Sequence, residues 1–239
     1  MLTTVFISDL HLHPTRDDLL NKFDIFVAWS QKNTTSIYIL GDLFHAWAGD
    51  DCIEPWIRKI AEKFKFLANY GIKLYFMPGN RDFLLGRQFA AYSSLNLLPD
   101  PTVIELGGEL VLLAHGDKYC TLDISHQKFR WLTRNRIFTH IFLSLPKSIR
   151  TKIVARVRAH SSQDRGQKAA NLDVVIPALL QDLMRHQAQN IIHGHTHNPN
   201  ILYHRHHNIT YRHFILSDWD TKPQILCYNA LNGFAIVYI

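Results

Sequence analysis

The chain has 239 residues, of which 47% are hydrophobic and 19% charged, and its formal net charge is +6. This balance excludes an intrinsically disordered chain and is typical of one globular domain, or of a domain that carries one large insertion. Cys52, Cys120 and Cys227 lie far apart with no CxxC spacing, so we expect neither a disulfide framework nor a thiolate zinc site. We also expect no signal peptide and no membrane-spanning segment.

Short apolar runs and helical periodicities alternate along the chain. The runs are rich in β-branched and aromatic residues and predict strands over residues 3–7, 36–40, 72–77, 110–114, 190–192, 214–216, 225–228 and 234–239. Thr15 and Asp18 predict a capping-box start for an early helix. Apolar residues at helical spacing from 53 to 68 predict a second helix that Gly71 ends. This order indicates an α/β fold, and the three consecutive C-terminal strands are expected to be antiparallel additions to a second sheet.

Residues 124–170 interrupt the alternation, and we expect them to be a helical insertion on a core of residues 1–123 and 171–239. Its first forty residues, 124–163, contain nine Lys or Arg and no Asp or Glu, so the basicity of the chain belongs to this segment. Ile137, Phe138, Ile141, Phe142 and Leu145 follow the spacing of one apolar helical stripe, and Pro146 is placed to open a further helix. The stripe either packs on the domain core or, beside the cations, docks on an anionic membrane surface.

Potential metal ligands follow five of the predicted strands. They occur in the motifs SDLH, GD, GNRD, HGD and HGHTH, as Asp9, His11, Asp42, Asn80, His115, His195 and His197. One such residue at a strand end is often only a turn residue. Because strand ends converge at one edge of an open α/β sheet, however, we expect all seven side chains to meet there. Oxygen and imidazole donors without thiolate suit manganese, iron or zinc.

The ordered pattern D-x-H, G-D, G-N-R-D, H-G-D and G-H-x-H resembles the calcineurin-like metallophosphoesterase family over nearly the whole chain. The resemblance implies a four-layer α/β/β/α sandwich of two mixed sheets with a helical cap. It also implies two divalent ions, with Mn2+ as the expected metal: Asp9, His11 and His197 would hold one, Asn80, His115 and His195 the other, and Asp42 would bridge them. Such a pair of ions activates water as the nucleophile, so no Ser or Cys is needed.

Arg81 distinguishes this chain from the many family members that have His at this position. A guanidinium cannot readily donate a proton, but it can stabilise phosphate oxygens or a diphosphate leaving group. We therefore expect Arg81 and the bridging Asp42 to act in catalysis on a pyrophosphate rather than on an alkyl phosphomonoester.

Within the family, the segments ILGDLFHAWAGDD, GNRDFLLG, HGDKYCT and IHGHTHNP resemble pyrophosphatases that act on UDP-2,3-diacylglucosamine in lipid A synthesis. The resemblance implies a peripheral place on the cytoplasmic face of the bacterial inner membrane. It also implies substrate contacts by Asn80, Arg81, Asp123, Ser161, Arg165, Lys168 and His195. Arg165 stands where the family commonly has Asn, and the hydroxyl of Ser161 is alternatively a solvated helix-end group.

Three other functions remain open from the sequence. One is a pyrophosphatase for a soluble nucleoside diphosphate derivative, and another is a nuclease that uses the basic segment. The apolar stripe between the cations argues against nucleic acid, since binding a phosphate backbone needs no such stripe. A third is a non-catalytic scaffold, but such relatives typically lose ligands, and all seven are present here.

Overall fold

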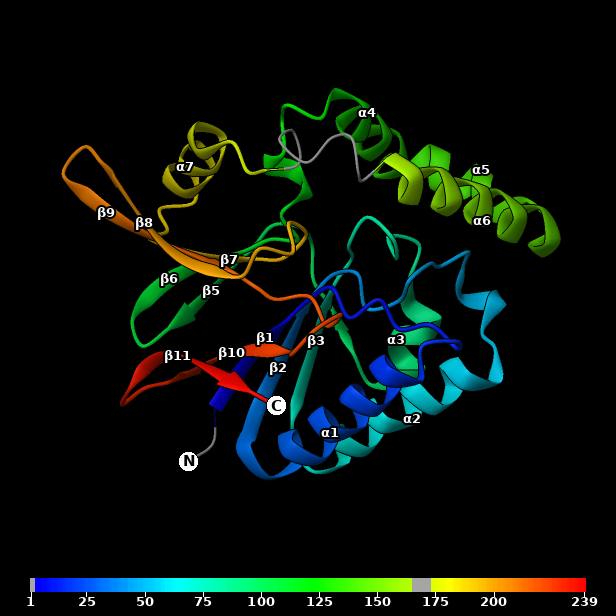
Figure 1. The fold of residues 1–239 in the computed structure, drawn as a ribbon, viewed down its shortest axis with the longest axis horizontal. Helices are drawn as coiled ribbons and strands as arrows, with labels where there is room; N and C mark the ends of the chain where they lie inside the picture. Colours follow the sequence, from blue (N-terminus) through cyan, green and yellow to red (C-terminus); the bar gives the residue numbers. More distant parts are fainter. Residues whose placement is uncertain (1–2, 165–172) are drawn as a thin grey trace.

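Two β-sheets pack face to face in the computed structural model, which describes residues 3–164 and 173–239, with 160–164 described by their backbone only (Figure 1). The first sheet has the order β11-β10-β1-β2-β3-β4. Its strands are β1 (Thr3–Ile7), β2 (Thr34–Leu40), β3 (Lys73–Met77), β4 (Asn96–Leu97), β10 (Gln224–Asn229) and β11 (Gly233–Tyr238). The strands from β1 to β4 are parallel, and β10 and β11 are antiparallel additions beside β1.

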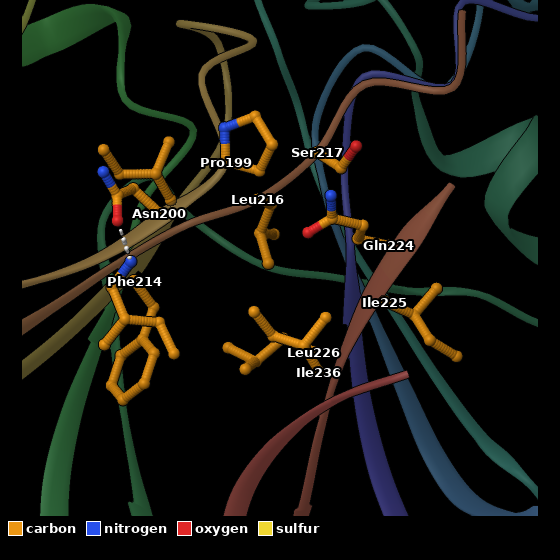
Figure 2. A pocket seen from close by; sticks show the side chains of 11 residues that line it. Pro199, Asn200, Phe214, Leu216, Ser217, Gln224, Ile225, Leu226 and Ile236 are labelled. Carbon is orange, nitrogen blue, oxygen red and sulfur yellow. Dashed lines mark hydrogen bonds between the residues drawn. The ribbon is translucent and has the colours of Figure 1, made fainter. Parts of the chain in front are cut away.

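The second sheet has the order β5-β6-β7-β9-β8 and is also mixed. Its strands are β5 (Thr102–Leu106), β6 (Glu109–Leu113), β7 (Asn190–His193), β8 (Asn200–His206) and β9 (Ile209–Ile215). Phe214, Leu216 and Leu226 lie where the two sheets close on each other, as Figure 2 shows, and the hollow between them measures only about 10 Å³. The space between the sheets is therefore core.

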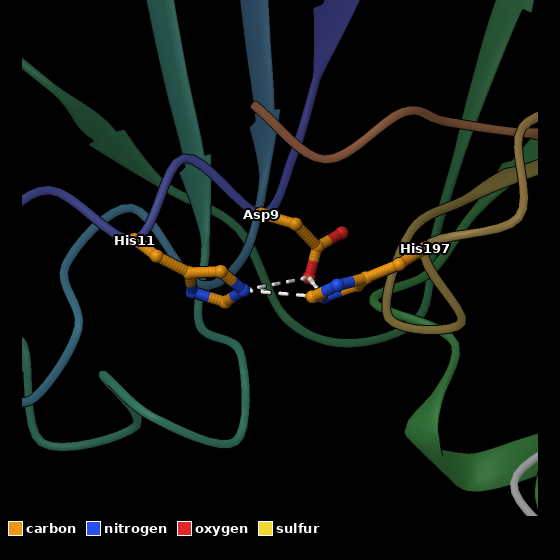
Figure 3. Close-up of side chains that lie close together, drawn as sticks. All are labelled: Asp9, His11 and His197. Carbon is orange, nitrogen blue, oxygen red and sulfur yellow. Dashed lines mark hydrogen bonds and ion pairs between the residues drawn. The ribbon is translucent and has the colours of Figure 1, made fainter. Parts of the chain in front are cut away.

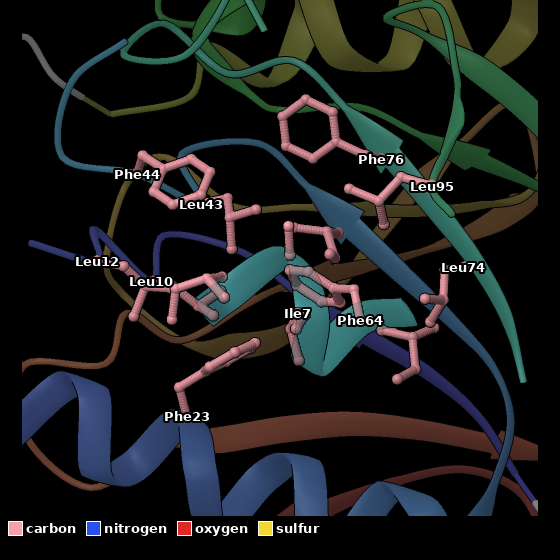
Figure 4. Packing of buried hydrophobic residues seen from close by; sticks show 14 of the residues in the cluster. Ile7, Leu10, Leu12, Phe23, Leu43, Phe44, Phe64, Leu74, Phe76 and Leu95 are labelled. Carbon is pink, nitrogen blue, oxygen red and sulfur yellow. The ribbon is translucent and has the colours of Figure 1, made fainter. Parts of the chain in front are cut away.

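Helices cover the outer face of each sheet. Helices α1 (Asp17–Asn33), α2 (Pro55–Asn69) and α3 (Arg87–Ser93) pack on the first sheet, and α7 (Ile176–Arg185) packs on the second. Figure 4 shows Phe23 of α1 and Phe64 of α2 beside Ile7 of β1 in the larger apolar cluster. The expected four-layer α/β/β/α sandwich is confirmed.

The helix predicted over residues 53–68 is confirmed as α2, but two other local predictions are wrong. The N-cap residue of α1 is Arg16, one position after Thr15, and its side chain makes no capping hydrogen bond. The Thr15 hydroxyl lies 2.8 Å from Nδ1 of His13 instead. Of the last three predicted strands only β9 belongs to the second sheet. Strands β10 and β11 extend the first, since β10 pairs with β1.

Residues of the predicted insertion form α4 (Ile124–Thr133), α5 (Arg136–Ser144) and α6 (Lys147–Asp164), which we call the cap (Figure 1). The apolar stripe was expected either to pack on the core or to dock on a membrane, and its residues divide into a buried and an exposed set. Phe142 is only 8% exposed and packs in the core cluster, which Phe138 and Leu145 also contact. Ile137 and Ile141 are 71% and 59% exposed. The division of the chain into core and insertion stays a prediction.

Three arginines of the basic segment fasten the cap to the core. Arg130 donates to carboxylate oxygens of Asp117 and Asp100, and Arg134 donates to the backbone carbonyl of Pro78. Arg150 is nearly fully buried and donates to the carbonyls of Ala48 and Leu145 and to a carboxylate oxygen of Asp51. These three positive charges of the basic segment are therefore engaged in contacts within the protein.

Candidate metal centre

The seven predicted ligands lie on loops that follow β1, β2, β3, β6 and β7, at one edge of the sandwich. Five of them have a left-handed backbone: φ is 55° at Asp9, 49° at His11, 55° at Asp42, 69° at His195 and 54° at His197. Such conformations are uncommon for residues other than glycine and concentrate at functional sites, where the surrounding structure maintains them. The backbone conformation of these loops is therefore constrained by the positions that the ligand side chains must occupy.

Asp9, His11 and His197 form a first group, drawn in Figure 3. The Nε2 atoms of the two histidines are 3.1 Å apart, and Asp9 Oδ1 lies 3.4 Å from Nε2 of His197. The other oxygen, Asp9 Oδ2, accepts hydrogen bonds from Ser8 Oγ at 2.7 Å and from the backbone N–H of His195 at 2.8 Å. Oδ1 is buried with no hydrogen bond from any described residue, so it is left for a cation.

Asp42, His115 and Asn80 form a second group beside the first, and Asp9, Asp42 and His115 also offer ligand atoms within reach of one ion. His115 Nδ1 donates to the carbonyl of Leu40 at 2.9 Å, which directs Nε2 into the site. Nε2 faces Asn80 Oδ1 at 2.9 Å and Asp42 Oδ1 at 3.7 Å. Only a further proton or a cation satisfies an imidazole nitrogen that faces two oxygen atoms, because both oxygens are acceptors.

The ionisable groups of the site perturb one another strongly. Burial raises the pKa of Asp42 to about 6, with Asp9 adding to the rise against the charge of His115. Burial alone would lower the pKa of His115, but Asp42, Asp117 and Asp9 raise it to about 9. Burial would raise the pKa of Asp9, but His197, His115 and His11 hold it well below its ordinary value. Positive charge is thus strongly favoured among these carboxylates.

His195 completes the predicted set. Its ring centroid lies 5.1 Å from that of His115, and burial together with the charge of His115 lowers its pKa to about 3. A neutral imidazole is the form that binds metal. The structure thus brings all seven side chains together, with a donor set of carboxylate, amide and imidazole groups that fits divalent ions such as manganese.

Glycines in the motifs allow this close approach. A Cβ atom at Gly194 would lie 2.2 Å from Asp9 Oδ2, and one at Gly79 would lie 2.1 Å from Asp42 Oδ1. Both positions therefore need a residue without a side chain, which explains the glycines of HGHTH and GNRD.

Asp82 and His193 stabilise the ligand loops through hydrogen bonds to their backbone. The Asp82 carboxylate accepts the backbone N–H of Gly79 at 2.8 Å and of Leu43 at 2.7 Å, and so ties the GNRD loop to the GD loop. His193 Nδ1 donates to the carbonyl of Gly194 at 2.8 Å, and its Nε2 lies 2.6 Å from Nε2 of His213. His213 was missed at the sequence level, because this residue lies on a different strand, β9, and belongs to none of the ligand motifs.

The predicted substrate residues are only partly within the described chain. Asp123 accepts the N–H of His126 at 3.0 Å and caps α4, and its contact with a substrate stays a prediction. Ser161 is described by its backbone alone, and Arg165 and Lys168 lie outside the described residues. Arg158, which the sequence interpretation placed only among the cations of the basic segment, lies near the centre. Burial lowers its pKa, and the charges of Asp42 and Asp82 oppose that shift.

A cavity of about 450 Å³ lies between α6 of the cap and the loop after β2. Its walls are largely apolar and include Trp47, Trp56, Ile57 and Val154. The polar residues of the lining are His13, His45, Glu54, Thr151 and Arg158. Arg81 joins this cavity to the ligand cluster, because Nη1 lies 3.2 Å from Nδ1 of His45 and Nε lies 3.3 Å from Asp42 Oδ2.

The chain belongs to the calcineurin-like phosphoesterase family, whose model matches residues 2–199. It is 42% identical to UDP-2,3-diacylglucosamine hydrolase of Aeromonas salmonicida, over 94% of this chain and 89% of that protein. It is 37% identical to UDP-2,3-diacylglucosamine hydrolase of Vibrio vulnificus, over 98% of this chain and 97% of that protein. Among solved structures, an archaeal phosphodiesterase matches over 100% of both chains with 11% identity and a TM-score of 0.48. The family resemblance seen in the sequence is confirmed.

Proposed function

We propose that the protein hydrolyses the pyrophosphate bond of UDP-2,3-diacylglucosamine, releasing UMP and 2,3-diacylglucosamine 1-phosphate, as a step of lipid A biosynthesis. The observation that carries the proposal is the ligand cluster joined through Arg81 to a largely apolar cavity. The first part suits a phosphoryl group and the second an acyl chain, so one molecule that contains both would span them. The names of the relatives, which match nearly the whole chain, support the same substrate.

The residues present fit two divalent ions, and Mn2+ is the metal we propose. Asp9, His11 and His197 would hold one ion, Asn80, His115 and His195 the other, and Asp42 would bridge them. When bound, such ions lower the pKa of the attacking water and offset charge on the phosphoryl oxygens. The buried Oδ1 of Asp9 and the inward Nε2 of His115 are the atoms that support this assignment.

Two arginines supply the remaining charge stabilisation. Arg81 is largely buried and its guanidinium stays protonated throughout, so it offers donors to the diphosphate oxygens without taking part in proton transfer. Arg158 approaches from the cap side of the cavity. A sugar phosphate is a good leaving group that needs no general acid, which is consistent with arginine instead of histidine at position 81.

We place the protein at the cytoplasmic face of the inner membrane as a peripheral protein. Trp131, Ile137 and Ile141 of the cap are 74%, 71% and 59% exposed. Lys128 and Arg136 are exposed on the same two helices. Exposed apolar side chains beside cations fit an anionic lipid surface. Across the described residues, no helix has the length and apolar character needed to cross a bilayer.

The direct test is to incubate the purified protein with Mn2+ and UDP-2,3-diacylglucosamine in mixed micelles and to follow UMP by chromatography. UMP should appear with the wild type, and chelation of the metal or the substitution His115→Ala should abolish it. UDP-N-acetylglucosamine, which lacks the long acyl chains, separates this function from that of a soluble nucleotide-sugar pyrophosphatase. Equal turnover of both substrates would argue for the soluble alternative.

A further inference from the structure

The Arg81 guanidinium is held from two sides. Its Nε lies 3.3 Å from Asp42 Oδ2, and its Nη1 lies 3.2 Å from Nδ1 of His45. The backbone N–H of Arg81 also donates to Asp42 Oδ1 at 2.9 Å, so the residue is anchored along its length. Arginine has five N–H donors, and these contacts engage only two of them, which leaves donors for a phosphoryl group.

The contact with Arg81 fixes the chemical form of His45. A guanidinium only donates hydrogen bonds, so Nδ1 of His45 must accept and cannot carry a proton. The ring is then neutral, with its hydrogen on Nε2. An acceptor at the Nδ1 position is therefore the feature of His45 that matters for Arg81.

The protein backbone and a neighbouring ring set the position of His45. The backbone N–H of His45 donates to the carbonyl of Leu12 at 3.1 Å, where the loop after β2 pairs with the loop after β1. The ring also meets that of His13 edge to face, with centroids 5.3 Å apart. His45 thus belongs to a fixed part of the cavity wall and can hold the guanidinium in a single orientation.

We propose that His45 is a positioning residue: through Nδ1 it orients the Arg81 guanidinium toward the phosphoryl group. The identity of the phosphoryl group rests on the proposed function, whereas the contact between His45 and Arg81 does not. A long arginine side chain has many rotamers, and an orienting partner removes that freedom before the substrate binds. The consequence is a neutral histidine that acts on the phosphoryl group through Arg81.

Two variants separate this role from general packing. Asn places its amide oxygen near the position of Nδ1 and keeps an acceptor for Arg81, whereas Leu keeps bulk and removes the acceptor. With the Mn2+-loaded protein, His45→Leu should lower kcat about 10- to 100-fold with a smaller change in KM, because the contact of Arg81 with the phosphoryl group is present in the bound state but strongest in the transition state. His45→Asn should stay within about threefold of the wild type. Matching losses in the two variants would overturn the proposal.

A double-mutant cycle tests whether His45 acts through Arg81. In an Arg81→Ala background, His45→Leu should change kcat less than about twofold, because the partner is already absent. The same cycle, measured as the affinity for UMP by calorimetry in the presence of Mn2+, does not require turnover of any lipid. Coupling in UMP affinity without UMP release from UDP-2,3-diacylglucosamine would refute only the proposed function. Independent, additive effects of the two substitutions on UMP affinity would refute the positioning role.

Discussion

The two faces of α5 offer the sharpest test of how the cap works. Ile137 and Ile141 are 71% and 59% exposed, whereas Phe142, on the same helix, is 8% exposed and packed in the core. Replacing Ile137 and Ile141 together by Ser should weaken binding to membranes and leave the fold intact, because Ser and Ile have similar helix propensities. Replacing Phe142 by Ser should do the reverse.

The exposed fractions set the size of both effects. Complete transfer of an isoleucine side chain from water stabilises by about 1.5–3 kcal/mol, so the exposed part of each residue contributes about 1–2 kcal/mol when it enters lipid. Loss of both residues then weakens partition into vesicles by about 30- to 1,000-fold. Truncation of the buried Phe142 leaves a cavity and lowers the free energy of unfolding by about 3–5 kcal/mol.

Sedimentation with vesicles of anionic lipid measures the partition, and urea unfolding followed by tryptophan fluorescence measures the stability. The double isoleucine variant should stay in the supernatant with an unchanged unfolding midpoint, and it should lose more turnover on the diacylated substrate than on a short-chain analogue. Undiminished sedimentation of this variant, or a large fall in its unfolding midpoint, would show that the isoleucines serve packing and that the membrane surface lies elsewhere.

Three further predictions concern the centre and its surroundings. Asp42→Ala should abolish UMP release while circular dichroism stays native, and retained turnover would remove Asp42 from the centre. Arg158→Ala should raise KM for UDP-2,3-diacylglucosamine about 10-fold or more, because a charge on the cavity wall is lost. Steady-state kinetics measures this change, and an unchanged KM would contradict the reasoning. Burial would raise the pKa of Asp182, but hydrogen bonds from Lys118 and Tyr119 lower it below 3.8. The ionised carboxylate therefore stabilises the fold above pH 3.8 and loses this effect as the pH falls through the lowered pKa. Asp182→Asn should cost about 1–2 kcal/mol in urea unfolding at pH 7 and progressively less toward pH 3, and a cost independent of pH would contradict this account.

The ligand cluster was predictable from the sequence because each ligand follows a strand directly. Asp9, Asp42 and Asn80 come after β1, β2 and β3, and the parallel order of these strands carries their ends to one edge. The rule needs only the strands and their direction. The short-range motifs therefore determine a long-range arrangement without any knowledge of the pairing between the two sheets.

Features that depend on pairing between distant segments were out of reach. Strand β10 pairs with β1, although most of the chain separates them in the sequence. No local sequence pattern indicates which sheet edge a C-terminal strand will pair with. The edge strand β8 was missed because its sequence alternates apolar and polar residues only weakly. All seven of its side chains are partly or fully exposed, so the strand needs no regular apolar face. Arg158 was visible only as one cation among nine, because its approach to Asp42 depends on how α6 docks.

The central claim is that water, activated at the cluster of Asp9, Asp42 and His115, attacks the uridylyl phosphorus. Hydrolysis of UDP-2,3-diacylglucosamine in water enriched in oxygen-18, followed by mass spectrometry of both products, tests it most directly. The heavy oxygen should appear in UMP and be absent from 2,3-diacylglucosamine 1-phosphate. Label in the lipid product, or no cleavage in the presence of Mn2+, would contradict the account.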